Sequence, residues 1–157
     1  MHSRIYQVSE KPVEDFISED RYYEGFVGNY ADYVSEVEHK SDDYLNDLKW
    51  LQNATNGLEV NIKEGTITII SKKEYFEKKY EEFKKLLEEL EATTLEEFIG
   101  NKCAFKMTSL KYTYDDTAGF YIDDNDDYVG LTTLDNWVRN AEEGKTYYVG
   151  TIIDYHF

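Results

Sequence analysis

The residues best suited to chemistry are the aspartates of YIDDNDDYVG, residues 121–130, where four aspartates fill five positions. No Lys or Arg occurs between Tyr112 and Val138, so these carboxylates have no basic neighbour in the sequence. Clustered carboxylates can ligate a hard cation such as Ca²⁺, attract a basic macromolecule, or only be hydrated. Each possibility makes different demands on the surrounding residues.

An EF-hand calcium loop is excluded by the residues at two of its positions. Asp123, Asn125 and Asp127 match positions 1, 3 and 5, but the loop also needs Gly at position 6 and Glu at position 12. Tyr128 and Leu134 stand there instead. The flanks predict a strand and then a capped helix, whereas an EF-hand joins two helices. An irregular, weak calcium site is kept only as an alternative.

No other arrangement of residues indicates catalysis. His2, His39 and His156 lack a Cys or His partner at zinc-ligand spacing. Cys103 is the only cysteine, so an intrachain disulfide is excluded, and we expect a buried structural thiol. Phosphate-binding glycine motifs and a GxSxG elbow are absent, and carboxylate pairs are too abundant to indicate a glycosidase. We expect a protein that is not an enzyme, with no cofactor and no metal ligands.

The composition favours a basic partner. The chain has 33 acidic and 17 basic residues, a net charge of −16, and 15 tyrosines. This charge repels nucleic acid and anionic lipid, and exposed tyrosines can anchor an interface. The alternative is that the acidity only confers solubility. The N-terminus MHSRIYQVSE has no signal-peptide core and no apolar run approaches a membrane span, so we expect a cytoplasmic protein.

The acidic residues are unevenly distributed along the chain. In a predicted helix over 72–92, Lys and Glu form opposite-sign i,i+4 pairs, each worth about 0.2–0.5 kcal/mol. Residues 14–47 instead contain eleven acids and only two bases, Arg21 and Lys40. Their acidic i,i+4 pairs would repel one another in a helix. This asymmetry suggests that the negative face is kept for a partner.

The elements that must position these residues begin with three helices in the N-terminal third. A short helix follows Pro12, which suits a first helical turn. A second begins at Asn29, because the next apolar residues follow the spacing of one helical face: Tyr30, Tyr33, Val34 and Val37. A third is capped by Ser41, with Asp42 and Asp43 in its first turn.

The remaining chain predicts strands and helices in mixed order. Alternating residues predict strands at 3–8, 58–63, 66–71, 103–108, 110–114, 119–122 and 146–156. Glu64-Gly65 would close a hairpin between the second and third of these. Ser71 caps the long helix, whose apolar stripe is expected to pack on the sheet. The segments 93–100 and 132–144 each read as a threonine-capped helix.

This order predicts an α+β fold over residues 1–157, a single globular domain whose mostly antiparallel sheet has helices packed on one face. The predicted core residues are Ile5, Val8, Phe16, Val34, Leu48, Leu51, Val60, Ile62, Ile67, Ile69, Phe83, Leu87, Phe98, Leu134, Trp137 and Ile152.

The segments YYEGF, NYADYVSEVE, YTYDD and YIDDNDDY carry a resemblance to a known class of proteins. In length, charge and richness in Asp and Tyr, the chain resembles the antirestriction proteins of mobile elements, which are DNA mimics. That resemblance implies inhibition of a nucleic-acid enzyme by occupation of its DNA site. Carboxylates about 5–6 Å apart on a helix can imitate the phosphates of a nucleic acid. The resemblance is compositional and transfers no functional residues.

The sequence therefore predicts a non-enzymatic acidic binding protein. Its partner is expected to be a basic protein such as a nucleic-acid enzyme, without direct binding to nucleic acid or membrane. The residues expected at the partner-binding face are Glu14, Asp15, Glu19, Asp20, Glu24, Asp32, Glu36, Asp115, Asp116, Asp123, Asp124, Asp126 and Asp127. The alternatives are an accessory or structural domain, an immunity protein for a basic toxin and, least favoured, a small enzyme or weak calcium binder.

Overall fold

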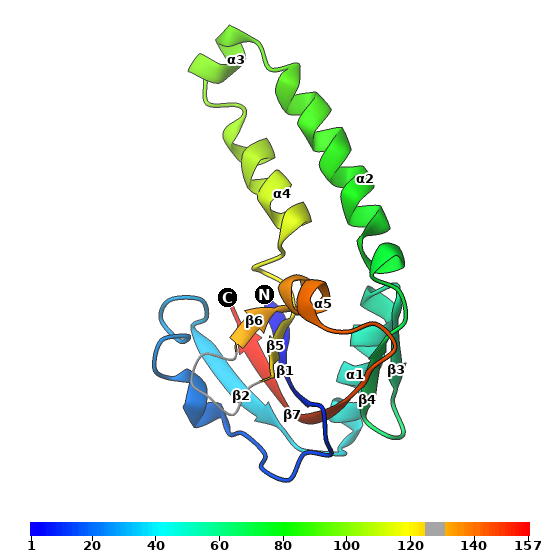
Figure 1. The fold of residues 1–157 in the computed structure, drawn as a ribbon. Coiled ribbons are helices and arrows are strands. Elements are labelled where there is room, and N and C mark those ends of the chain that lie inside the picture. Colours follow the sequence, from blue (N-terminus) through cyan, green and yellow to red (C-terminus); the bar gives the residue numbers. More distant parts are fainter. Residues whose placement is uncertain (125–130) are drawn as a thin grey trace.

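The chain forms a sheet-based body from which a helical hairpin projects (Figure 1). The computed structural model describes residues 1–124 and 131–157. Its strands are β1 (His2–Ser9), β2 (Tyr33–Val37), β3 (Leu58–Asn61), β4 (Thr66–Ile69), β5 (Tyr121–Asp123), β6 (Leu131–Thr133) and β7 (Thr146–His156). Its helices are α1 (Asp42–Ala54), α2 (Lys72–Glu91), α3 (Leu95–Ile99), α4 (Ala104–Tyr114) and α5 (Leu134–Asn140), with a 3-10 turn η1 (Glu19–Tyr22).

Strand β7 organises the sheet because it pairs along both edges. One edge pairs antiparallel with β1, and the other pairs antiparallel with β4 and, further along, with β2. The strand order is β3-β4-β7-β1-β5-β6, with β2 beside β7. Among the described strands, the β1–β5 pair is parallel and the rest are antiparallel. The predicted α+β class with a mostly antiparallel sheet is confirmed.

The sheet carries a core on each face, because successive side chains of a strand point to opposite faces. Tyr6 of β1 and Ile152 of β7 join the core beneath α1 and α5. Their neighbours Ile5 and Ile153 join a second core on the other face. The helices α1 and α5 thus share one face, while the segment containing η1 covers the other.

Local sequence signals for helix starts and for one hairpin are confirmed. Ser41, Ser71, Thr94 and Thr133 each accept a hydrogen bond from the backbone N–H three residues later, at the starts of α1, α2, α3 and α5. Strands β3 and β4 form the predicted hairpin, although its turn covers residues 62–65 rather than only Glu64-Gly65.

Two of the predicted N-terminal helices are wrong. The segment after Pro12 is irregular because the Gln7 side chain holds it to the sheet: Nε2 donates to the carbonyl of Asp15 (2.8 Å) and Oε1 accepts from the Ile17 N–H (3.3 Å). Residues Tyr33–Val37, predicted as helix, form β2 because the open edge of β7 offers backbone partners. Long-range pairing therefore overrides an apolar spacing that also fits a helix.

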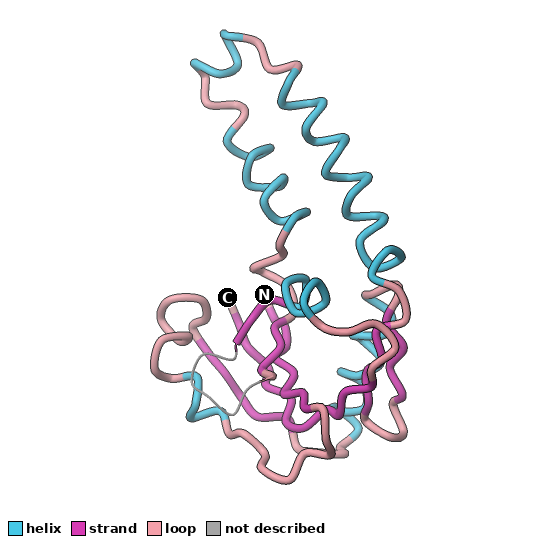
Figure 2. Tube along the Cα trace, viewed as in Figure 1, coloured by secondary structure: helices cyan, strands magenta, loops and turns pink. Residues whose placement is uncertain are grey.

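The segments 103–108 and 110–114, predicted as strands, form helix α4 instead. Helices α2 and α4 run antiparallel and stand off the sheet, and Figure 2 shows this part of the chain as helix and loop only. The expectation that α2 packs on the sheet is wrong beyond its first turn, because only Tyr75 and Phe76 reach the core.

The hairpin also explains most errors in the predicted core. Leu87 and Phe98 are exposed and Phe83 is half-buried, because these residues lie on α2 and α3 away from the sheet. Phe16 is exposed on the irregular N-terminal segment, and Ile62 is half-buried in the β3–β4 turn. The remaining predicted core residues are buried.

Candidate functional site

Basic side chains of both the body and the hairpin are directed at buried or partly buried carboxylates of the body. Arg4 Nε lies 2.8 Å from Asp47 Oδ2, and Arg4 Nη1 lies 2.5 Å from Asp154 Oδ1. Lys79 Nζ lies 2.8 Å from Asp135 Oδ2. Asp47 and Asp135 are both buried, so these cations offset the cost of removing two negative charges from water. They consequently do little to neutralise the outer surface.

Asp123 follows the same pattern and is a structural residue. It is buried at the end of β5, with its Oδ2 3.1 Å from Arg21 Nε. The Tyr22 hydroxyl donates a hydrogen bond to Oδ2 at 2.8 Å. Burial and the adjacent Asp123 charge raise the pKa of Tyr22 far above its ordinary value, which keeps the hydroxyl a donor. The prediction that Asp123 lies on the partner-binding face is wrong, because the side chain is inaccessible.

This buried contact joins η1 to the end of β5. The end of β5 lies against η1, and a hollow of about 310 Å³ opens beside the contact. Arg21, Glu24, Tyr30, Asp123 and Leu131 are among the residues that line it. Residues 19–36 therefore lie beside the end of β5 on the body.

Residues 19–36 turn two of their aromatic side chains inward and three outward. Tyr22 and Phe26 are buried in the second core, whereas Tyr23, Tyr30 and Tyr33 are exposed. The acids between them are exposed as well. We call this exposed set the acidic–tyrosine segment: Asp20, Tyr23, Glu24, Tyr30, Asp32, Tyr33 and Glu36.

The carboxylates of this segment have few internal partners. Asp32 Oδ1 lies 2.7 Å from His156 Nδ1. Asp20 and Glu36 form no ion pair with any residue in 1–124 or 131–157. Glu19 is half-buried, and its carboxylate accepts a hydrogen bond from the Glu36 N–H at 2.7 Å, so it holds the end of β2 rather than facing solvent fully.

The other predicted acids lie in different places. Glu14 and Asp15 are exposed on the irregular segment after β1. Asp115 and Asp116 are half-buried at the base of the hairpin, where the Thr133 hydroxyl donates to Asp115. Burial raises the pKa of Asp116. Asp126 and Asp127 lie outside the described residues, and Asp124 lines a pocket.

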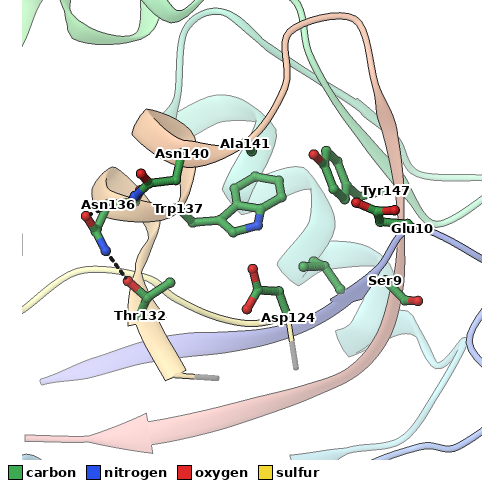
Figure 3. Close-up of a pocket in the computed structure, with 10 residues that line it drawn as sticks. Ser9, Glu10, Asp124, Thr132, Asn136, Trp137, Asn140, Ala141 and Tyr147 are labelled. Carbon is green, nitrogen blue, oxygen red and sulfur yellow. Dashed lines mark hydrogen bonds between the residues drawn. The ribbon is translucent and has the colours of Figure 1, made fainter. Parts of the chain in front are cut away.

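That pocket has a volume of about 450 Å³ and lies between β1, α5 and the end of β5 (Figure 3). Figure 3 shows the Asp124 carboxylate below the Trp137 indole, with Asn136 and Glu10 on opposite sides. Glu10 Oε1 lies 2.5 Å from Lys145 Nζ. Partial burial raises the pKa of Asp124. The pocket could hold a small polar molecule, but the described residues that line it include no paired nucleophile and base.

Metal and histidine chemistry find little support in the part of the chain that is described. No group of three or more His, Cys, Asp or Glu residues there could hold a metal ion. His2 pairs with Asp154 at 3.1 Å, and the His39 ring lies between Phe16 and Tyr44. The calcium alternative depends partly on residues 125–127, which lie outside the described residues. Cys103 is buried and free, as expected.

Asp135 joins the hairpin to the body. Its carboxylate accepts three hydrogen bonds of 2.8 Å, from the Tyr75 hydroxyl, Lys79 Nζ and the Asp116 N–H. These donors come from α2 and from the residues that follow α4, whereas Asp135 belongs to α5. Nothing local in the sequence distinguishes Asp135 from the other acids, so this junction was not predicted.

The hairpin surface was missed as well. Nine large hydrophobic side chains between residues 72 and 114 are exposed: Tyr80, Leu87, Leu95, Phe98, Ile99, Phe105, Met107, Tyr112 and Tyr114. Exposed apolar side chains that lie together on a soluble protein mark interaction sites. Recognising α4 as a helix would have revealed it.

Comparison of the chain with family models, with curated proteins and with solved structures finds no match. None of the helices in residues 1–124 and 131–157 combines the length and apolar character needed to cross a membrane.

Proposed function

We propose that this chain is a non-enzymatic binding protein that presents its acidic–tyrosine segment to a basic protein, at a surface built to hold DNA or RNA. The observation that supports this most is the pairing of cations inside the body. Arg4 and Lys79 are directed at buried or partly buried aspartates, while Asp20 and Glu36 have no ion pair among the described residues. These exposed carboxylates are therefore available to the cations of a partner.

The distribution of charge between body and hairpin supports the same proposal. Residues 72–114 contain nine lysines and nine glutamates, so their net charge is zero. The remaining residues therefore carry the whole net charge of −16. A field of this sign accelerates encounter with a basic protein and repels nucleic acid itself.

The exposed tyrosines suit such an interface. Tyr23, Tyr30 and Tyr33 lie among acids, and Tyr30 stacks on the buried Phe26 with ring centroids 5.7 Å apart. A tyrosine ring anchored in this way adds contact area at low entropic cost and can stack on an arginine of the partner. Nucleic-acid sites are rich in the arginines and lysines that this arrangement would engage.

A binding panel tests the proposal. The full-length protein is immobilised and exposed to purified nucleases, restriction enzymes and Cas-type effectors at low and at high salt. We expect at least one basic protein to be retained at low ionic strength and released as salt shortens the screening length. If no basic protein is retained at low ionic strength, the proposal fails. Retention of a single partner that resists salt would instead indicate an immunity protein for that partner.

A further inference from the structure

We infer that the α2–α4 hairpin is the interface for a second copy of this chain, with the two hairpins antiparallel. This inference does not rest on the proposed function, because a different part of the molecule carries it. Its basis is an apolar surface that the described residues leave largely exposed, together with a charge pattern in which one half of the hairpin is basic and the other acidic.

Helix α4 is the first line of evidence. No residue of α4 is buried, yet Phe105, Met107, Tyr112 and Tyr114 are all exposed large side chains. A helix with apolar residues on several sides is normally enclosed by other elements. The contact with α2 covers only one side of it (Figure 1), so α4 needs a further partner.

Four of the exposed large side chains of the two helices form a strip on one side of the hairpin. Half-buried Phe83 on α2 and Leu110 on α4 mark the sides on which the helices meet. Three residues before and four after Phe83, Tyr80 and Leu87 are exposed. Met107 and Tyr114 are exposed at the same spacing from Leu110. In an antiparallel helix pair, residues at the same spacing from the contact residue of each helix lie on the same side of the pair. We call these four residues the hairpin strip: Tyr80, Leu87, Met107 and Tyr114.

The charges of the hairpin indicate that the partner of the hairpin strip is a second copy of this chain. The Lys106–Glu89 pair, 3.9 Å apart, shows that the start of α4 lies beside the end of α2. The half nearer the body, residues 72–86 and 109–114, has seven lysines and four glutamates, a net charge of +3. The outer half, residues 87–108, has two lysines and five glutamates, a net charge of −3. An antiparallel copy therefore places each half beside a half of opposite sign.

The antiparallel direction also suits the bodies. Each chain carries its net charge of −16 outside the hairpin, so two bodies at the same end would repel each other. Antiparallel hairpins hold the bodies at opposite ends of the assembly. The dimer would then display two acidic–tyrosine segments, one at each end.

Sedimentation equilibrium of the full chain tests the strip. We expect a mass of two chains of 18.5 kDa each. Replacing two strip residues, Tyr80→Ser with Met107→Ser, is expected to give monomers. The matched control, Phe105→Ser with Tyr112→Ser, alters two exposed residues on the other side of α4 and should stay dimeric. If the wild type is monomeric at about 100 µM, its free energy of association is weaker than about −5.5 kcal/mol, and the inference is overturned. Loss of the dimer in the control alone would also overturn it.

Charge reversal tests the direction. Glu88→Lys, Glu91→Lys and Glu96→Lys turn the outer half from −3 to +3, and we expect dimerisation to weaken at least about tenfold. Adding Lys73→Glu, Lys78→Glu and Lys111→Glu turns the inner half from +3 to −3 and should restore it. Helix content by circular dichroism confirms that each variant is folded. If the first triple variant dimerises as the wild type does, the antiparallel arrangement is wrong.

Discussion

Replacing Asp135 by alanine is expected to lower the free energy of unfolding by about 3 kcal/mol. The substitution leaves the Tyr75 hydroxyl, Lys79 Nζ and the Asp116 N–H without the acceptor that they share. Each of these donors is wholly or partly buried, and a buried donor without a partner costs free energy. Lys79 is partly exposed, so water recovers some of the loss. Denaturant unfolding followed by circular dichroism measures the change.

The matched control for this prediction is Asp20→Ala. Asp20 is exposed and forms no ion pair with the described residues, so its removal should change stability by less than about 0.5 kcal/mol. If the two substitutions lower the free energy of unfolding equally, the hydrogen bonds to Asp135 contribute no more than an exposed carboxylate does. Because the junction joins α2, α5 and the residues after α4, the Asp135 variant should also lose protection from hydrogen exchange first at the base of the hairpin.

Reversing the acids of the acidic–tyrosine segment is expected to abolish binding to the basic partner. The variant replaces Asp20, Glu24, Asp32 and Glu36 by lysine and changes the net charge from −16 to −8. Four attractive contacts then become repulsive, and we expect a loss of affinity of about 100-fold or more. Titration calorimetry against a partner retained in the binding panel measures the change.

A second variant separates the position of the charge from its amount. Lysine at Glu64, Glu77, Glu81 and Glu82 produces the same net charge of −8 with four exposed acids changed elsewhere. This control should bind within about tenfold of the wild type, since only the long-range field is reduced. If both variants lose affinity equally, the acidic–tyrosine segment is not the contact surface.

Much of the fold could be predicted because its signals are local. Helix caps such as Ser41 and Thr94 need only a side-chain oxygen and a nearby backbone N–H, and both were recognised. The β3–β4 hairpin was likewise recognised from two alternating segments and a short turn. These features depend on neighbours in the chain.

The errors come from features that depend on distant partners. Residues Tyr33–Val37 have an apolar spacing that also fits a helix, and only the open edge of β7 makes them a strand. Helix α4 has apolar side chains on more than one side, so its sequence alternates as a strand does. No periodicity within either segment could have decided between the two structures.

The acids of residues 20–36 that were predicted to be exposed are exposed, but not every residue of the predicted acidic face is. Asp20, Glu24, Asp32 and Glu36 are exposed as expected, whereas Asp123 is buried against Arg21 and Tyr22. Exposed and buried aspartates look alike in a sequence. What distinguishes Asp123 is a cation about one hundred positions earlier in the chain, which only the fold brings near.

If this protein occupies a site made for nucleic acid, it must compete with DNA for an enzyme that it binds. A fluorescently labelled duplex is bound to a nucleic-acid enzyme retained in the panel, and its anisotropy is followed as this protein is added. We expect the wild type to displace the duplex completely. The variant with lysine at Asp20, Glu24, Asp32 and Glu36 should displace no duplex. A ternary complex, in which the enzyme holds the duplex and this protein together, would contradict it.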